Sequence, residues 1–133
     1  MTNDWIEFKE NSYELKRKLP RVLLTELKLF RLNRKALELI GNPKAVCLFY
    51  DAGRNRIGIR ADENGSNHSL PIRMRDRGGQ TGTVHAAMFC NRFGIRPEVT
   101  IEFDSVRVDA DGTLILELGT AKTVPPRMRM RKV

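Results

Sequence analysis

Hydrophobic residues dominate the segment from Val22 to Leu32, and their spacing favours a strand. One set of side chains falls on a single face at a period of two, and a second set fills the opposite face. The first set is Val22, Leu24, Phe30 and Leu32, and the second is Leu23, Leu27 and Leu29. Leu23, Leu27 and Phe30 also fit one face of a helix, which stays open as the alternative. We predict a strand that is buried on both sides.

The next stretch predicts a short helix followed by a β-hairpin. Asn33 is a good N-cap residue, residues 34–40 form the helix, and Gly41 suits the C′ position that ends it. Residues 45–51 (AVCLFYD) have the pattern of a strand, and residues 56–60 (RIGIR) have that of the returning strand. The first unit is therefore predicted as strand, short helix and hairpin.

The second half of the chain returns to the same pattern after a polar connector, residues 62–82. Within the connector, residues 72–75 alternate apolar and basic side chains, and we predict an edge strand there. Residues 84–93 have helical spacing, and residues 98–104 alternate as a strand does. Gly94 ends the predicted helix, Asp111-Gly112 predicts a hairpin turn, and residues 113–118 are the predicted return strand.

The two halves match each other at an offset of 53 residues, which aligns Gly41 with Gly94. The pairs that follow without a gap are Val46 and Val99, Leu48 and Ile101, Tyr50 and Phe103, and Asp51 and Asp104. One helix with one hairpin is too small to bury a stable core, so we predict that two copies share a pseudo-twofold core. That core is expected to contain Leu37, Ile40, Val46, Leu48, Tyr50, Ile57 and Ile59 from one copy, and Phe89, Phe93, Val99, Ile101, Phe103, Leu114 and Leu116 from the other.

The first unit resembles a known family in the runs 29–41 (LFRLNRKALELIG), 46–51 (VCLFYD) and 56–60 (RIGIR). These runs resemble AbrB/SpoVT-type swapped-hairpin domains, and the tandem copy is similar to the arrangement of MraZ-type regulators. The resemblance implies an α+β, β-rich fold in which two strand-helix-hairpin repeats pack as a pseudo-twofold, swapped-hairpin-like barrel. It also implies a DNA-binding transcription regulator or an antitoxin-like protein. The implied division is an N-terminal segment, 1–27, a first repeat, 28–61, the connector, 62–82, a second repeat, 83–119, and a basic tail, 120–133.

The charge of the chain points to an anionic partner. Lys and Arg number 24 against 16 Asp and Glu, which gives a formal net charge of +8. Half of that excess lies in residues 125–133, which carry no acidic residue. The alternative for this tail is a disordered, solubilising end.

Arginine suits DNA because its planar guanidinium contacts phosphates and guanine edges with two hydrogen bonds. Double-stranded DNA is favoured as the partner, since only 7% of the residues are aromatic and no aromatic ladder offers stacking for unpaired bases. The predicted DNA-binding residues are Arg54 and Arg56 beside the first hairpin, Arg73, Arg75 and Arg77 in the connector, and Arg127, Arg129, Arg131 and Lys132 in the tail.

No catalytic or metal-binding constellation stands out, so we predict a protein that is not an enzyme and has no cofactor. His68 and His85 lack metal-ligand spacing to other ligand residues. Cys47 and Cys90 stand in apolar stretches and are expected to be buried structural thiols. The equivalent aspartates at 51 and 104 are interpreted as turn-starting residues rather than as a catalytic pair.

A non-catalytic protein-interaction or assembly module is the alternative function. Trp5, Ile6 and Phe8 form a small apolar cluster, and residues 1–30 would then be the docking segment for a protein partner. A homodimer is also open, since the two repeats could pair within one chain or swap between chains. No apolar run approaches 18 residues and no secretory signal is recognised, so we expect no membrane association and a cytoplasmic location.

Overall fold

The structure is a computed structural model that describes residues 4–7, 19–74, 81–103 and 105–124. These residues form a β-rich α+β fold with two antiparallel sheets and two short helices, α2 (Arg34–Leu39) and α3 (Ala87–Phe93). The six-stranded sheet has the order β11 (Lys122–Thr123), β8 (Ile101–Glu102), β1 (Val22–Leu24), β2 (Leu29–Leu32), β7 (Gly82–His85) and β6 (Arg73–Met74). The five-stranded sheet has the order β5 (Leu70–Pro71), β3 (Ala45–Asp51), β4 (Arg56–Ala61), β10 (Leu114–Glu117) and β9 (Arg107–Val108).

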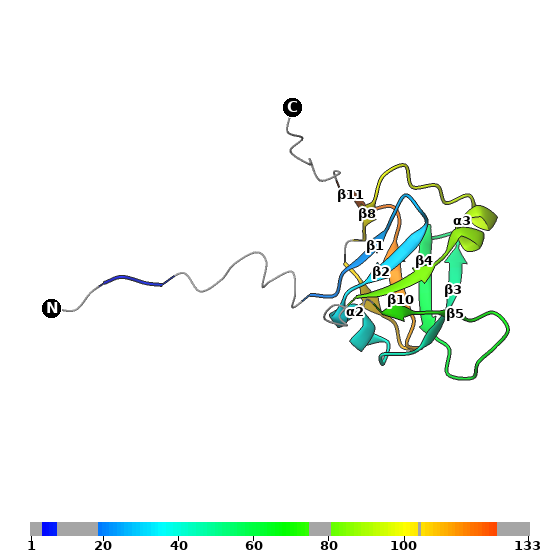
Figure 1. Cartoon of the computed structure of the whole chain (residues 1–133). Coiled ribbons are helices and arrows are strands. Elements are labelled where there is room, and N and C mark those ends of the chain that lie inside the picture. The colour runs from blue at the N-terminus through cyan, green and yellow to red at the C-terminus, as the bar shows by residue number, and fades with distance from the viewer. Residues whose placement is uncertain (1–3, 8–18, 75–80, 104, 125–133) are drawn as a thin grey trace, which may run out of the picture.

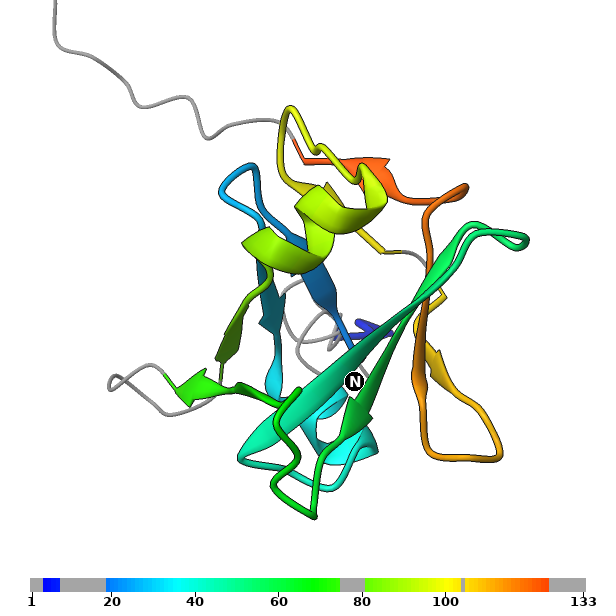
Figure 2. The ribbon, with the colours of Figure 1, turned by 90° about the vertical axis from the view of Figure 1, so that its right-hand side faces the viewer.

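The two sheets form two layers around one hydrophobic core. In Figure 1, β1 and β2 lie in front of β4 and β10. Figure 2 shows the same layers edge-on, with α3 at one end of the space between them and α2 at the other. The two described helices therefore cover opposite ends of the core, and neither of them packs on the outer face of a sheet.

The core draws its side chains from both sheets and from both helices. Val22, Leu24, Phe30, Leu32 and Val84 enter it from the six-stranded sheet. Val46, Ile57, Ile59, Leu114 and Leu116 enter it from the five-stranded sheet, and Ala36, Leu37 and Cys90 come from the helices. Most of the predicted core is confirmed, with Leu48, Tyr50, Phe89 and Ile101 packed at its margin. Phe93 and Val99 are the errors, because 43% of the surface of Phe93 is exposed on α3 and Val99 does not belong to the core cluster.

The segment 22–32 is extended as predicted, but it forms a hairpin rather than one strand. Val22 lies opposite Leu32 and Leu24 lies opposite Phe30, so the apolar set with a period of two faces the core from both strands. The turn between the strands contains Lys28 with a φ of 61°, and Leu27 is 72% exposed. The prediction of burial on both sides is therefore wrong, since the second apolar set lies on the outer side.

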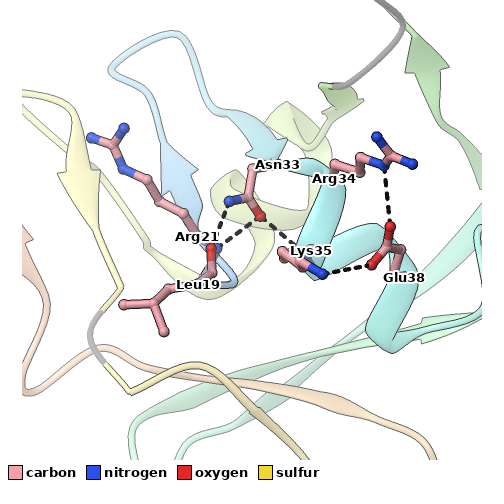
Figure 3. A network of polar contacts seen from close by, with 7 residues as sticks. Leu19, Arg21, Asn33, Arg34, Lys35 and Glu38 are labelled. Carbon is pink, nitrogen blue, oxygen red and sulfur yellow. Dashed lines mark hydrogen bonds and ion pairs between the residues drawn. The ribbon is translucent and has the colours of Figure 1, made fainter. Parts of the chain in front are cut away.

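Helix α2 begins and ends where the sequence predicts. The Asn33 Oδ1 atom accepts hydrogen bonds from the backbone N–H groups of Ala36 (3.0 Å) and Arg21 (2.9 Å). Its Nδ2 group donates to the carbonyl oxygen of Leu19 at 2.8 Å, so one side chain joins the helix to the entry of β1 (Figure 3). Gly41 follows the helix with a φ of 82°, which confirms its role as the terminating residue.

The hairpin of β3 and β4 confirms the prediction for residues 45–60. Val46 lies opposite Ala61 and Asp51 lies opposite Arg56, which fixes the register over the whole length of β3. The predicted edge strand in the connector is also confirmed, because β6 is the last strand of its sheet and pairs only with β7 among the described residues.

The second half departs from its predicted pattern at three places. Residues 82–85 form β7 between β2 and β6, so the helix begins at Ala87 and not at Val84. Strand β8 contains only Ile101 and Glu102 of the predicted strand 98–104. The Asp111-Gly112 turn does form a hairpin, but it joins β9 to β10.

Because of these differences, the two halves that the sequence aligns at an offset of 53 residues are alike in structure only in part. The glycines aligned at the ends of α2 and α3 both have a positive φ, 82° at Gly41 and 66° at Gly94. The strands that follow these glycines lie in different sheets, since β3 belongs to the five-stranded sheet and β8 to the six-stranded sheet. Over the described residues the sheets do not join into a closed barrel.

Candidate nucleic-acid interface

Three of the nine predicted DNA-binding residues lie in the described part of the chain, and they do not form one group. Arg54 and Arg56 belong to the hairpin of β3 and β4, while Arg73 lies on β6 in the other sheet. The remaining six residues, Arg75, Arg77, Arg127, Arg129, Arg131 and Lys132, lie outside the described residues.

Arg56 is engaged by an acidic neighbour. Its Nε atom lies 3.2 Å from Asp51 Oδ2, and the two residues are directly opposite each other on β3 and β4. The backbone N–H of Arg54 donates to Asp51 Oδ1 at 3.2 Å. This hydrogen bond, together with the Arg56 guanidinium, holds the pKa of Asp51 below its ordinary value. The carboxylate therefore competes with any phosphate for Arg56.

Arg73 lies near the opposite end of strand β3 from this pair. Ala45, at the start of β3, pairs with Pro71, two residues before Arg73. Asp51, at the end of β3, pairs with Arg56. Six steps along a strand span about 20 Å, so Arg73 and Arg56 serve different regions of the surface.

Arg73 instead belongs to a row of side chains that crosses the outer face of the six-stranded sheet. It lies opposite Thr83 on β7, and Thr83 lies opposite Arg31 on β2. Arg31 in turn lies opposite Leu23 on β1, which lies opposite Glu102 on β8. Because neighbouring strands are about 4.8 Å apart, the two arginines of this row are about 10 Å apart at the backbone.

The three strands at this end of the sheet carry no acidic residue. Strands β2, β7 and β6 contain Arg31, His85 and Arg73 as their ionisable residues. His85 is exposed on the same face of β7, two residues along the strand from Thr83 and opposite Leu29. Among the described residues, Arg31 and Arg73 have no acidic partner within ion-pair distance. We call Arg31, Thr83, His85 and Arg73 the basic face.

The acid nearest to the basic face within this sheet is already paired. Glu102 Oε1 lies 2.5 Å from the Nε atom of Arg21, at the entry of β1. Both side chains are about one third exposed, so the pair is in contact with solvent. Its carboxylate therefore does little to reduce the positive potential over β2, β7 and β6.

The outer face of the five-stranded sheet is less suited to phosphates, because its arginines are engaged. Arg107 lies 3.1 Å from Glu117, and Arg56 is paired with Asp51. Arg60 donates to Thr113 at 2.9 Å and stacks over the Phe49 ring at 5.2 Å from the centroid. This face combines ion pairs with an exposed aromatic ring.

Arg31 is the residue that sequence reasoning missed. The sequence predicts that the segment 22–32 is buried on both sides, which leaves no place for an outward arginine. The signal was nevertheless present, because Arg31 alternates with Phe30 and Leu32, and both of these are fully buried. A charged residue between two core residues of a strand has to face away from the core.

The other chemically active side chains form no site of their own. Cys90 is buried, as expected, and desolvation raises the pKa of its thiol. Cys47 is only half-buried and lies 3.7 Å from the Ser66 hydroxyl, so its predicted burial is wrong. The described residues hold no group of three or more metal-ligand side chains. None of the described helices is long and apolar enough to span a membrane.

Comparison with known proteins adds no relative to these observations. The chain matches no family model, no curated protein and no solved structure. The resemblance to swapped-hairpin regulators therefore stays a prediction.

Proposed function

We propose that this protein binds double-stranded DNA through the basic face and acts as a transcription regulator or an antitoxin-like protein. The observation that carries the proposal is the row that places Arg31 and Arg73 on either side of Thr83, on strands without acidic residues. Two guanidinium groups and a hydroxyl group in one line can donate hydrogen bonds to consecutive backbone phosphates.

The proposed contacts provide affinity rather than sequence recognition. Phosphates neutralised by arginine release bound counterions, so the binding must weaken steeply as salt is added. Arg75 and Arg77 follow Arg73 directly in the sequence, and with the tail cations Arg127, Arg129, Arg131 and Lys132 they would add charge to the same complex. Arg56 is assigned a smaller part, since its side chain is paired with Asp51, and Arg54 lies in the same hairpin, where its backbone N–H donates to the same carboxylate.

The finer architecture that we propose is a duplication. Antiparallel pairing of β2 with β7, and of β4 with β10, supports two related halves. The placement of α2 and α3 at opposite ends of the core is consistent with a pseudo-twofold, swapped-hairpin-like arrangement (Figure 2). In this interpretation β9, rather than β8, is the counterpart of β3, since β3 pairs with β4 as β9 pairs with β10.

The proposal is tested by fluorescence anisotropy of labelled random duplex DNA over a range of salt concentrations. We expect binding at low salt that falls linearly on a plot of log affinity against log salt concentration. A duplex that stays unbound at low salt would overturn the proposal. A variant with the four tail cations changed to glutamine separates binding by the folded part from binding by the tail.

A second candidate function is a protein-assembly module that docks through its N-terminal segment. Trp5 is 89% exposed and Ile6 is 95% exposed. Two adjacent large apolar side chains in contact with water favour an interaction segment, because such surface is stabilised when a partner covers it.

A further inference from the structure

One residue of the basic face, His85, has no side-chain partner. Strand β7 buries Gly82 and Val84, so the residues between and after them, Thr83 and His85, share the outer face of the six-stranded sheet. The His85 side chain is exposed, and within the described part of the chain it has no hydrogen-bond or ion-pair partner. Its imidazole can therefore bind a proton and donate to a ligand at no cost in existing contacts.

The sheet register places His85 beside both arginines of the row. Arg31 and Arg73 each lie opposite Thr83, one on either side of β7. Each arginine is therefore a diagonal neighbour of His85 across the strands, at about 7–8 Å between backbones. A phosphate that either arginine holds lies within reach of the imidazole.

The charges on the elements around His85 are mostly positive. These elements are strands β2 and β6, the turn between β1 and β2, and helix α3, which Ala86 joins to that turn by a hydrogen bond to the carbonyl oxygen of Lys28. The charged residues that they contribute are Arg31 on β2, Arg73 on β6, Glu26 and Lys28 in the turn, and Arg92 in the last turn of α3. Four cations against one exposed carboxylate make this end of the sheet attractive to an anion.

We infer that His85 is a third phosphate contact of the basic face and that its protonation strengthens duplex binding as the pH falls. The inference rests on the DNA binding proposed above and adds a regulation of that same site. Histidine is the side chain that ordinarily changes its charge between about pH 5 and pH 8. The imidazolium donates a charge-assisted hydrogen bond to a phosphate, and the neutral ring contributes no charge.

Proton binding and DNA binding at this face are linked. A phosphate beside His85 favours the protonated ring, so the protonated protein binds the duplex more tightly by the same factor. The contribution of His85 is therefore present on the acidic side and is lost as the pH rises. The basic face would then respond to pH in a range where the guanidinium groups of Arg31 and Arg73 do not titrate.

The test measures the affinity of the full chain for labelled random duplex DNA between about pH 7.5 and about pH 5.5, at fixed salt concentrations. We expect binding to tighten by up to about fivefold over this range, which is the size of one exposed ion pair. The dependence of log affinity on log salt concentration should become steeper by about 1, because one more phosphate is neutralised. His85→Gln should remove both changes. His85→Lys should bind at the higher pH as tightly as the parent protein does at the lower pH.

The chain supplies a matched control, because its other histidine lies elsewhere. His68 is exposed in the loop before β5, which belongs to the five-stranded sheet. His68→Gln should keep the pH dependence of the parent protein. Duplex binding that does not change with pH, or a pH dependence that survives in His85→Gln, would overturn the inference and leave the DNA proposal standing. Absence of binding at every pH would overturn both, so the two failures are distinguishable.

Discussion

Arg31 and Arg73 lie two strands apart in one cross-strand row, with Thr83 between them on β7. The row faces away from the core, because the residues that alternate with Arg31, Phe30 and Leu32, are fully buried. Neither arginine has an acidic partner among the described residues. The fold thus places two cations that are 42 positions apart in the sequence on one surface.

Asn33 should be one of the most sensitive polar positions for stability. Asn33→Ala removes the N-cap of α2 and the two hydrogen bonds that tie it to Leu19 and Arg21 (Figure 3). We expect a loss of about 2 kcal/mol in the free energy of unfolding, measured by urea denaturation. Asn33→Asp keeps both accepted bonds and loses only the donor to Leu19, so its loss should be smaller. Equal losses would contradict the assigned role of the cap oxygen.

Gly82 should tolerate no side chain. A Cβ atom at this position would lie 2.6 Å from Ile72 Cγ2 and 3.2 Å from Leu37 Cδ2. Gly82→Ala should therefore cost about 1–3 kcal/mol of unfolding free energy through overpacking. Gly119→Ala is the control, since a Cβ there meets nothing within 4 Å and its loss should stay below about 0.5 kcal/mol. Thermal unfolding that ranks the two variants in the reverse order would contradict the packing.

The hydrogen bonds of Asp51 predict a pH-dependent contribution to stability. The pKa of Asp51 is lowered in the folded protein from 3.8, so folding favours the ionised form. This contribution is present above about pH 4 and is lost as the pH falls through the lowered pKa. Asp51→Asn should therefore be less stable than the parent protein at pH 7, and the difference should shrink below pH 4.

Asp62 provides an independent test of the same effect. Its carboxylate accepts hydrogen bonds from the Ser66 hydroxyl at 2.9 Å and from the Ser66 backbone at 3.0 Å, and these lower its pKa. Asp62→Asn should show the same pH profile when unfolding is followed by circular dichroism. A stability difference that widens on acidification would contradict the account for either residue.

The two thiols should differ in reactivity. Cys90 is fully buried on α3, and desolvation raises the pKa of its thiol, which reduces the thiolate that reacts. Cys47 is half-buried on the outer side of β3. A colorimetric thiol assay of the native protein should show one fast and one slow reaction. Cys47→Ser should remove the fast phase and Cys90→Ser the slow one, and loss of the fast phase in Cys90→Ser would contradict the burial.

Local signals in the sequence were reliable. Asn33 and Gly41 bound α2, and Asp111-Gly112 turns the chain between β9 and β10, because capping and turn formation depend on a few adjacent residues. Residues 82–85 misled because Val84 fits a helix face as well as a strand. Their pairing with β2 and β6 is a contact between distant segments, which periodicity does not report.

The candidate site was predictable only in part. Arg73 was identified from the alternation of basic and apolar residues in the connector, and its strand is confirmed. Its partner Arg31 depends on the turn after Leu24, which sends β2 back beside β1 and leaves one face outward. The separation of Arg54 and Arg56 from Arg73 depends on the division into two sheets, which nothing in the local sequence specifies.

The salt dependence of duplex binding by two matched double variants tests the central claim most directly. Arg31→Gln with Arg73→Gln removes two charges from the basic face, and Arg60→Gln with Arg107→Gln removes two from the five-stranded sheet. The slope of log affinity against log salt concentration is negative. If the basic face contacts DNA, the first variant makes this slope shallower by about 2, and the second leaves it near that of the parent protein. Equal slopes for the two variants, with both folded by circular dichroism, would contradict the claim.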